Sequence, residues 1–143
     1  MLTMKAKYGL KALADLARLA PDTMMQTREV AQKHRISKKF LDAIMAELRV
    51  AGMVRARKGP GGGFALALPP SQIFIGDILR VLDGPLAPVA CASRTAYVPC
   101  ADCGDEATCL VRRTMLEVRE AIAAVLDRKS LESFAADRSE AAA

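Results

Sequence analysis

The length and composition of the chain limit what it can be. Its 143 residues, 52% of them hydrophobic, can bury one core, which predicts a compact domain with an appendage rather than two independent domains. The sequence has no apolar run of about 18 residues, the length that a membrane helix needs. Its first residues carry Lys5 and Lys7 without a hydrophobic signal stretch behind them, so we expect a cytoplasmic protein with no membrane partner.

The charge is divided unevenly along the chain. The net charge is +5, but residues 1–67 hold 13 Lys and Arg against 5 Asp and Glu, whereas residues 68–143 hold 8 against 11. A basic half joined to a mildly acidic half indicates a nucleic-acid-binding head on an assembly module. Solvated surface lysines without a partner are the alternative.

Three helices are predicted in the N-terminal half. Apolar residues at helical spacing predict the first helix over about residues 5–19. Thr27 is the expected N-cap of a short second helix over residues 28–35, and Ser37 is the expected cap of a third helix that ends at Gly52. The link between the second and third helices has the length of a helix-turn-helix connection.

A glycine-rich segment, RARKGPGGGFALA, follows the third helix at residues 55–67. Around it the apolar period changes from about 3.6 to 2, which predicts two strands joined by a glycine turn. A nucleotide P-loop is excluded because Gly63 is followed by Phe64 and not by lysine. The dinucleotide fingerprint fails because position 64 is not glycine. Three helices followed by a basic hairpin predict a winged helix-turn-helix.

The basic residues of the third helix and the glycine segment are the expected contacts to DNA. Lys38 and Lys39 occupy the first helical turn, where the helix dipole makes a cation cost about 0.3–1 kcal/mol, so phosphates or guanine edges as partners would explain them. Asp42 can accept from cytosine or pair with Lys38 one turn earlier. The residues predicted to bind DNA are Thr27, Arg28, Ser37, Lys38, Lys39, Asp42, Arg55, Arg57, Lys58, Gly59, Gly61 and Gly62.

The four cysteines, Cys91, Cys100, Cys103 and Cys109, fall within 19 residues. In a cytoplasmic chain such a group indicates a metal, iron–sulfur or redox site rather than a disulfide framework. Inert core residues are the alternative. Thiolates suit both zinc and iron–sulfur clusters, but zinc is disfavoured because only Cys100 and Cys103 have the C-x-x-C spacing.

After the cysteines, apolar residues recur in steps of 4 and 3, which predicts a helix with a seam that packs on a partner helix. The seam residues are Val111, Met115, Val118, Ile122 and Val125. Folding of this helix back onto its own head is the alternative. In a homodimer, the two third helices would lie about one DNA turn apart, roughly 34–36 Å, on a palindromic operator.

The predicted organisation has four parts. Residues 1–83 form the winged helix-turn-helix head, including a helix at 73–83 that braces the wing. Residues 84–109 form a cysteine-bearing sensor loop, residues 110–128 the dimerisation helix, and residues 129–143 a flexible tail. The expected fold is mainly α, a winged helix-turn-helix with a small two-stranded β wing and a long C-terminal dimerisation helix.

Four segments together resemble the winged-helix regulators typified by IscR and NsrR, over residues 1–128: ISKKFLDAIMAELRVAGMV, RKGPGGGFALA, IFIGDILRVLDGPL and the ending CLVRR. The resemblance implies a homodimeric, sequence-specific DNA-binding transcription regulator, often a repressor. It also implies that three loop cysteines hold an iron–sulfur cluster that tunes DNA binding. Members without a cluster act through partners or thiol chemistry.

On this resemblance, Cys91 is the first ligand, and Cys103 and Cys109 match the final C-x5-C pair. Cys100 is an additional thiol that could replace Cys103 or complete a set of four. The histidine that some members have three residues after the last cysteine is Arg112 here, and the acid that others have before the Tyr-Gly pair is lysine. The fourth ligand is then Cys100 or an open iron position, in a cluster of the 2Fe–2S or 4Fe–4S type.

The sequence therefore predicts a DNA-binding transcription regulator, a repressor by the family resemblance, whose DNA affinity an iron–sulfur cluster controls. The alternative is a metal-free regulator of the same fold that senses oxidation through a disulfide or persulfide of Cys100 and Cys103. Acids at positions 102, 105 and 106 would raise the pKa of these thiols, which disfavours a fast thiol sensor. An enzyme is disfavoured because His34, the single histidine, lies far in sequence from the cysteines.

Overall fold

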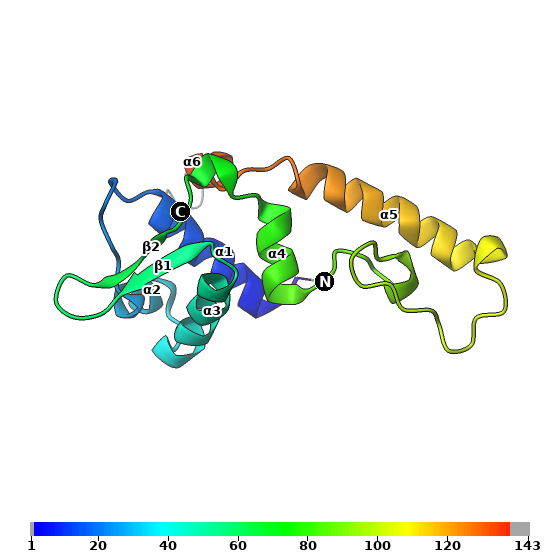
Figure 1. The fold of residues 1–143 in the computed structure, drawn as a ribbon, viewed down its shortest axis with the longest axis horizontal. Helices are drawn as coiled ribbons and strands as arrows, with labels where there is room; N and C mark the ends of the chain where they lie inside the picture. The colour runs from blue at the N-terminus through cyan, green and yellow to red at the C-terminus, as the bar shows by residue number, and fades with distance from the viewer. Residues whose placement is uncertain (1, 138–143) are drawn as a thin grey trace.

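The computed structural model describes residues 2–137 and consists of a winged helical head and a long helical arm (Figure 1). The head contains helices α1 to α4, helix α6 and both strands. The arm is α5 (Leu110–Leu126), which extends away from the head with the loop of residues 84–109 along its side. The predicted mainly α fold with a two-stranded wing is confirmed.

Three helices form the core of the head: α1 (Met4–Ala17), α2 (Thr27–His34) and α3 (Lys38–Val50). Their inner faces carry the apolar residues that recur at helical spacing. Leu13, Leu41, Ile44 and Leu48 on these faces are buried completely, and later helices of the head add Ile78 and Leu131 to the same core. Only residues 35–37 separate α2 from α3, as a helix-turn-helix requires.

One of the two predicted helix caps is present. The Ser37 hydroxyl accepts a hydrogen bond of 3.0 Å from the backbone N–H of Phe40 and caps α3. The prediction that Thr27 caps α2 is wrong, because Thr27 is buried and is the first residue of that helix, while Gln26 occupies the cap position in extended backbone. The physical reason is that Met25 pairs with the wing, which keeps the chain extended up to Gln26.

The wing consists of the antiparallel strands β1 (Val54–Arg57) and β2 (Gly63–Leu66). A second pairing attaches it to the head, since Met25 and Phe64 exchange two backbone hydrogen bonds of 2.9 Å each. Gly63 permits this close approach. Its φ is 136°, and a Cβ added to it would lie 2.6 Å from the carbonyl oxygen of Met25.

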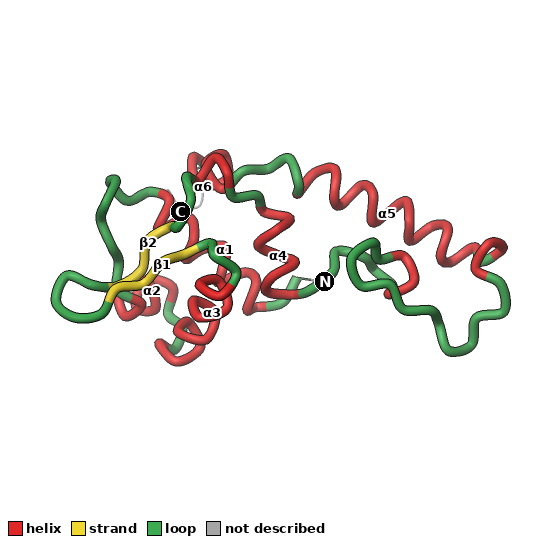
Figure 2. The backbone as a smooth tube through the Cα atoms, viewed as in Figure 1, coloured by secondary structure: helices red, strands yellow, loops and turns green. Residues whose placement is uncertain are grey.

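An ion pair joins the arm to the head. Arg80 of α4 (Ile75–Asp83) donates to both carboxylate oxygens of Asp127, at 2.7 and 2.9 Å. The hydrogen bonds from Arg80 lower the pKa of Asp127. Gly76 makes room for this contact, because a Cβ there would overlap a carboxylate oxygen of Asp127. Figure 2 shows the long loop that connects α4 to the far end of α5.

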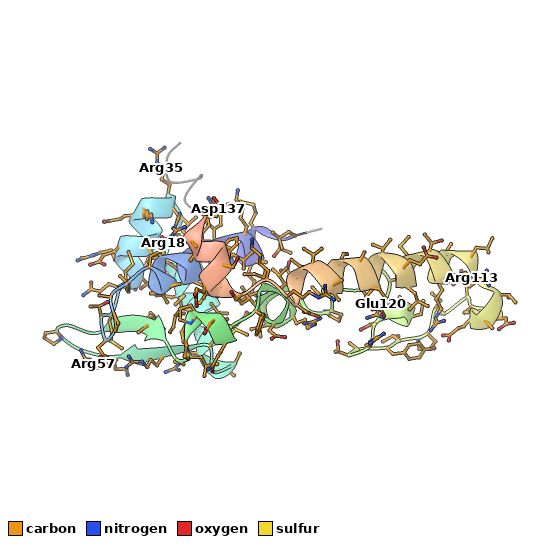
Figure 3. All side chains as sticks on the ribbon, turned by 90° about the horizontal axis from the view of Figure 1, so that it is seen from above. Arg18, Arg35, Arg57, Arg113, Glu120 and Asp137 are labelled. Carbon is orange, nitrogen blue, oxygen red and sulfur yellow. The ribbon has the colours of Figure 1, made fainter. Side chains whose placement is uncertain are left out.

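The end of the described chain differs from the predicted flexible tail. Leu131–Ala136 form α6, which packs on α1 with Leu131 fully buried. Arg18, which follows the last residue of α1, donates to the backbone oxygens of Ala135 and Asp137, at 2.9 and 3.2 Å (Figure 3). The tail prediction is therefore wrong up to residue 137, and its remainder, 138–143, lies outside the described residues. No helix in residues 2–137 is both long and apolar enough to cross a bilayer.

Gly63→Ala is expected to destabilise the head by about 3 kcal/mol, because an unfavourable φ is combined with a clash against the Met25 backbone. Gly59→Ala is the matched control. Its φ of 87° is also positive, but no atom lies within 4 Å of the added Cβ, so we expect a loss of about 1 kcal/mol. Urea denaturation followed by circular dichroism measures both, and equal losses would contradict a structural role for the Met25 contact.

Candidate nucleic-acid interface

The first turn of α3 carries one paired and one unpaired cation. Lys38 donates to Asp42 at 2.8 Å, and this hydrogen bond is the main cause that lowers the pKa of Asp42. Lys39 is exposed and forms no ion pair with any residue from 2 to 137. Of the two roles open to Asp42, the structure shows the pairing with Lys38. Its contact with a base stays a prediction.

Within residues 2–137, no acid forms an ion pair with the cations of the wing. Arg57 lies at the wing end of the molecule, opposite to Arg113 on the arm (Figure 3), and donates to the Gly61 carbonyl at 3.1 Å. Arg55 donates to a backbone carbonyl of β2 at 3.4 Å. Lys58 is exposed and has no ion-pair partner in the described chain. Their positive charges are free to meet phosphates.

A shallow hollow of about 300 Å³ brings the two groups of predicted DNA contacts together on one face of the head. Its lining residues are Gln26, Thr27, Arg28, Lys38, Gly59, Gly62, Gly63 and Phe64. Five of these eight are predicted from the sequence. The other seven predicted residues lie outside the hollow on the same helices and hairpin. Gln26, Gly63 and Phe64 are not predicted, because no local pattern reveals that the chain before α2 pairs with β2.

The start of α2 makes the hollow more attractive to anions. No side chain caps this helix, so the backbone N–H groups of Thr27 and Arg28 have no side-chain acceptor at the edge of the hollow. The positive end of the helix dipole lies at the same place. The glycine turn and the start of α2 thus place backbone donors and the positive end of a helix dipole beside Lys38 in one hollow.

The single histidine lies away from the cysteines. His34 Nε2 is 2.7 Å from a carboxylate oxygen of Asp15, which is buried and also binds Lys33. These contacts tie α2 to α1. No Cys–His pair exists among residues 2–137, so the geometry contains no activated thiol nucleophile of that kind.

The four cysteines lie beside α5 at different depths. Cys91 is in a 3₁₀ turn, Ala90–Ala92, and is 6% exposed. Cys109 is half-buried and precedes α5, and its sulfur accepts a hydrogen bond of 3.4 Å from the backbone N–H of the first turn. Cys100 and Cys103 are exposed on one turn, which a 3.3 Å hydrogen bond from the Cys103 N–H to the Cys100 carbonyl closes.

Arg112 connects the first and last cysteines. Its Nε donates to the Cys91 carbonyl at 3.2 Å, while its backbone N–H donates to the sulfur of Cys109. Its guanidinium also lies 3.9 Å from Glu106, which accepts a hydrogen bond from Tyr97. The residue at the position of the family histidine therefore holds the loop against α5, a role that the sequence does not reveal.

The thiols lie close enough to influence one another. The pKa of Cys100 is raised, first by its side-chain contact with Cys91 and then by desolvation and by Asp102. The pKa of Cys103 is raised by desolvation, by Glu106 and by the neighbouring thiols. Two of the three acids expected to raise these pKa values therefore do so. The third, at position 105, instead accepts a backbone hydrogen bond of 3.0 Å in the next turn.

The loop fits an iron–sulfur cluster in its donor chemistry, because four soft thiols lie in one segment. The arrangement is not a formed metal site. Within residues 2–137, no three His, Cys, Asp or Glu side chains are grouped as metal ligands would be. The exposed turn of Cys100 and Cys103 is the part of the loop that would have to move for such a grouping.

One side of α5 is apolar and uncovered. Val111 and Val125 are 63% and 67% exposed, Val118 is 38% exposed, and Met115 and Ile122 are half-buried. At about 100° per residue these positions form one stripe. Arg112 and Glu120, which contact the loop, lie about 100° and 180° around the helix from the middle of this stripe. The seam is thus not folded onto the head of its own chain, which was the alternative to a partner helix.

The comparisons with known proteins agree with this geometry. The sequence matches the Rrf2 family, described as iron-dependent transcriptional regulators, over residues 2–137. An rrf2-like protein of Rhodobacter capsulatus is 40% identical over 139 residues, which are 95% of this chain and 93% of that protein.

Two solved structures share the fold over nearly the whole chain. CymR, the global cysteine regulator of Bacillus subtilis, superposes with a TM-score of 0.77 at 30% identity, covering 95% of this chain and 96% of CymR. IscR of T. potens superposes with a TM-score of 0.75 at 28% identity, covering 99% and 90%. CymR of Bacillus subtilis and IscR of Aliivibrio salmonicida are both named as HTH-type transcriptional regulators. The chain belongs to the Rrf2 family of transcriptional regulators.

Proposed function

We propose that this protein is a homodimeric, sequence-specific repressor that acts on a palindromic operator in the cytoplasm, and that the state of its cysteine loop sets its DNA affinity. The observation that carries the proposal is the hollow in which the first turn of α3 and the glycine turn share one face. A duplex on that face would meet α3 in its major groove and the wing on its backbone, as a winged helix requires.

The charges of this face support DNA as the partner. Lys39 in the first turn of α3 can donate to guanine O6 and N7. Arg57 and Lys58 lie on the wing, where phosphate contacts would release counterions and make the affinity fall with salt. No acid from residues 2–137 pairs with any of these three side chains, so DNA would not have to displace an internal partner.

The exposed stripe of α5 supports a second copy of this chain as the dimer partner. Valine side chains at 111, 118 and 125 are exposed along one side of a helix of 17 residues. Their steps of seven residues are those of a two-helix seam. A twofold axis on this seam would present two heads to the two halves of a palindrome.

An iron–sulfur cluster held by Cys91, Cys103 and Cys109, with Cys100 as the fourth thiol, is the form of control that we propose. Such a group, when bound, supplies a centre that responds to iron and to oxidation. The protein transmits the change, since Arg112 joins the Cys91 turn to the first turn of α5. A coupling free energy of about 1–3 kcal/mol would change operator affinity about 5–150-fold.

A metal-free thiol switch is the second candidate, and one contact favours it. The side chain of Cys100 interacts with Cys91, so oxidation would join these two rather than the Cys100–Cys103 pair expected from the C-x-x-C spacing. The raised pKa of Cys100 disfavours a fast thiol sensor, because it keeps this thiol protonated and slow to react at neutral pH.

Lys39→Ala is expected to weaken binding to the operator about tenfold, because it removes a contact to a base edge. Arg57→Ala and Lys58→Ala are expected to weaken binding to all DNA sequences by the same factor. Each should also lower the slope of log affinity against log salt concentration by about 1. Arg113→Gln, which removes a charge from the arm, is the control. Fluorescence anisotropy over a salt series checks this, and indifference of binding to all three head variants would refute the interface.

Val118→Glu is expected to convert the dimer into monomers, since it places a charge in the middle of the seam. Arg113→Glu places the same charge on another side of α5 and should leave the dimer intact. Multi-angle light scattering measures the mass, and circular dichroism verifies that α5 stays helical. A monomeric wild-type chain, or a dimeric Val118→Glu variant, would contradict the seam.

Protein purified without oxygen is expected to contain iron and sulfide and to absorb visible light. Cys91→Ser and Cys109→Ser should abolish that absorption, and Cys100→Ser tests whether Cys100 is a ligand. Under the thiol alternative, the wild-type chain is colourless and iron-free, and oxidation consumes two thiols unless Cys91 or Cys100 is replaced. Analysis of the same sample for zinc tests whether the cysteines bind zinc instead.

A further inference from the structure

Arg119 is a buried cation whose hydrogen bonds are incomplete. It lies on α5, is 8% exposed, and its terminal nitrogen binds Glu120. Its Nε is buried and has no hydrogen-bond partner in the described chain. Glu120 also accepts from Arg94 at 2.5 Å, so one carboxylate serves two guanidinium groups. An unpaired buried donor on a charged group costs free energy, and a negative charge beside the guanidinium would offset part of that cost.

Arg119 lines a pocket between α5 and the loop that follows α4. The pocket has a volume of about 430 Å³, which suits a small metabolite. Glu120, labelled in Figure 3, marks its place along the arm. The charged residues of the lining are Arg80, Arg94, Arg119, Arg128, Glu120 and Asp127. The uncharged residues of the lining are Leu86, Ala87, Ser93, Thr95, Ala123 and Ala124.

The pocket has an excess of two positive charges, because it is lined by four arginines and only two acids. Both acids already have partners. Asp127 pairs with Arg80, and Glu120 pairs with Arg94 and Arg119. Arg128 forms no ion pair with the residues that the structure describes. A ligand with two negative charges would balance this excess.

We infer that this pocket binds a small organic dianion. Its carboxylate or phosphate oxygens accept from the guanidinium groups of Arg119 and Arg128 that line the pocket, with the charge-assisted hydrogen bonds that guanidinium groups form with both oxyanions. Its short carbon chain lies against Ala123 and Ala124, the small apolar part of the lining on α5.

The position of the pocket connects such a ligand to DNA binding. The lining joins the Arg80–Asp127 pair, the loop residues that follow the Cys91 turn and the middle of α5. A bound dianion would hold the loop and α4 against α5. Binding of the ligand does not depend on the proposed function, but its effect on operator affinity rests on it.

Isothermal titration calorimetry of the full chain tests the inference, with succinate and glycerol 3-phosphate as dianions, inorganic phosphate as the bare oxyanion and succinamide as the neutral analogue. We expect saturable binding of at least one organic dianion, one per chain, and none of succinamide. Arg119→Met should weaken it at least about tenfold, the loss of one charge-assisted hydrogen bond. Arg94→Gln should also weaken binding of the dianion. Arg94 is exposed, so this second variant is not expected to disturb folding.

Arg113→Gln is the matched control, since it removes an arginine from the same helix outside the pocket. Equal weakening by this variant, absence of binding by both organic dianions, or equal affinity for inorganic phosphate would each overturn the inference. The tighter of succinate and glycerol 3-phosphate identifies the head group. Operator affinity, measured with and without the dianion, is a separate readout: a chain that binds the dianion but no DNA refutes the proposed function and leaves the site intact.

Discussion

Two backbone hydrogen bonds between Met25 and Phe64 determine where the basic groups of the head lie. They attach the wing to the chain just before α2, so that the glycine turn and two helix starts line one hollow. Gly63 is required because a side chain there would collide with Met25. Gly62 is required for a different reason, since its Cβ would meet the carbonyl of Arg57 inside the turn. The glycines therefore serve the contact between wing and head as much as the turn itself.

The two helices of the helix-turn-helix differ in the charges of their first turns. α2 has Glu29 in its first turn and Lys33 and His34 in its last, which is the stabilising arrangement. α3 has no acid in its first turn and begins with Lys38 and Lys39. Only the first of these is compensated, by Asp42. The uncompensated Lys39 at this helix start is what the proposed contact with DNA would explain.

The helices, the Ser37 cap and the wing are predictable from the sequence because the local residue pattern and the tertiary contacts favour the same structure there. The prediction fails where a contact between residues distant in sequence determines the local structure. Helix α6 is too short to be stable alone, and the burial of Leu131 against α1 holds it. The serine before it, which accepts from the N–H of Ser133 at 3.1 Å, is the one local signal of its start. The contact of Cys100 with Cys91 likewise depends on how the loop folds along α5, and C-x-x-C spacing contains no information on that.

In the proposed regulation the arm would act as a lever, because its two ends are attached differently. Its last turn is followed by Asp127, which Arg80 holds to the head, while its first turn, with Cys109, lies far from the head (Figure 1). A continuous helix of 17 residues is stiff over about 25 Å at 1.5 Å per residue, so under the proposed regulation a change in the loop at its first turn would move the helix as a body about the Arg80–Asp127 joint. In a dimer paired along the exposed valines, rotation at that joint would change the distance between the two heads. The proposed sensor cysteines would then act on DNA binding without touching the DNA.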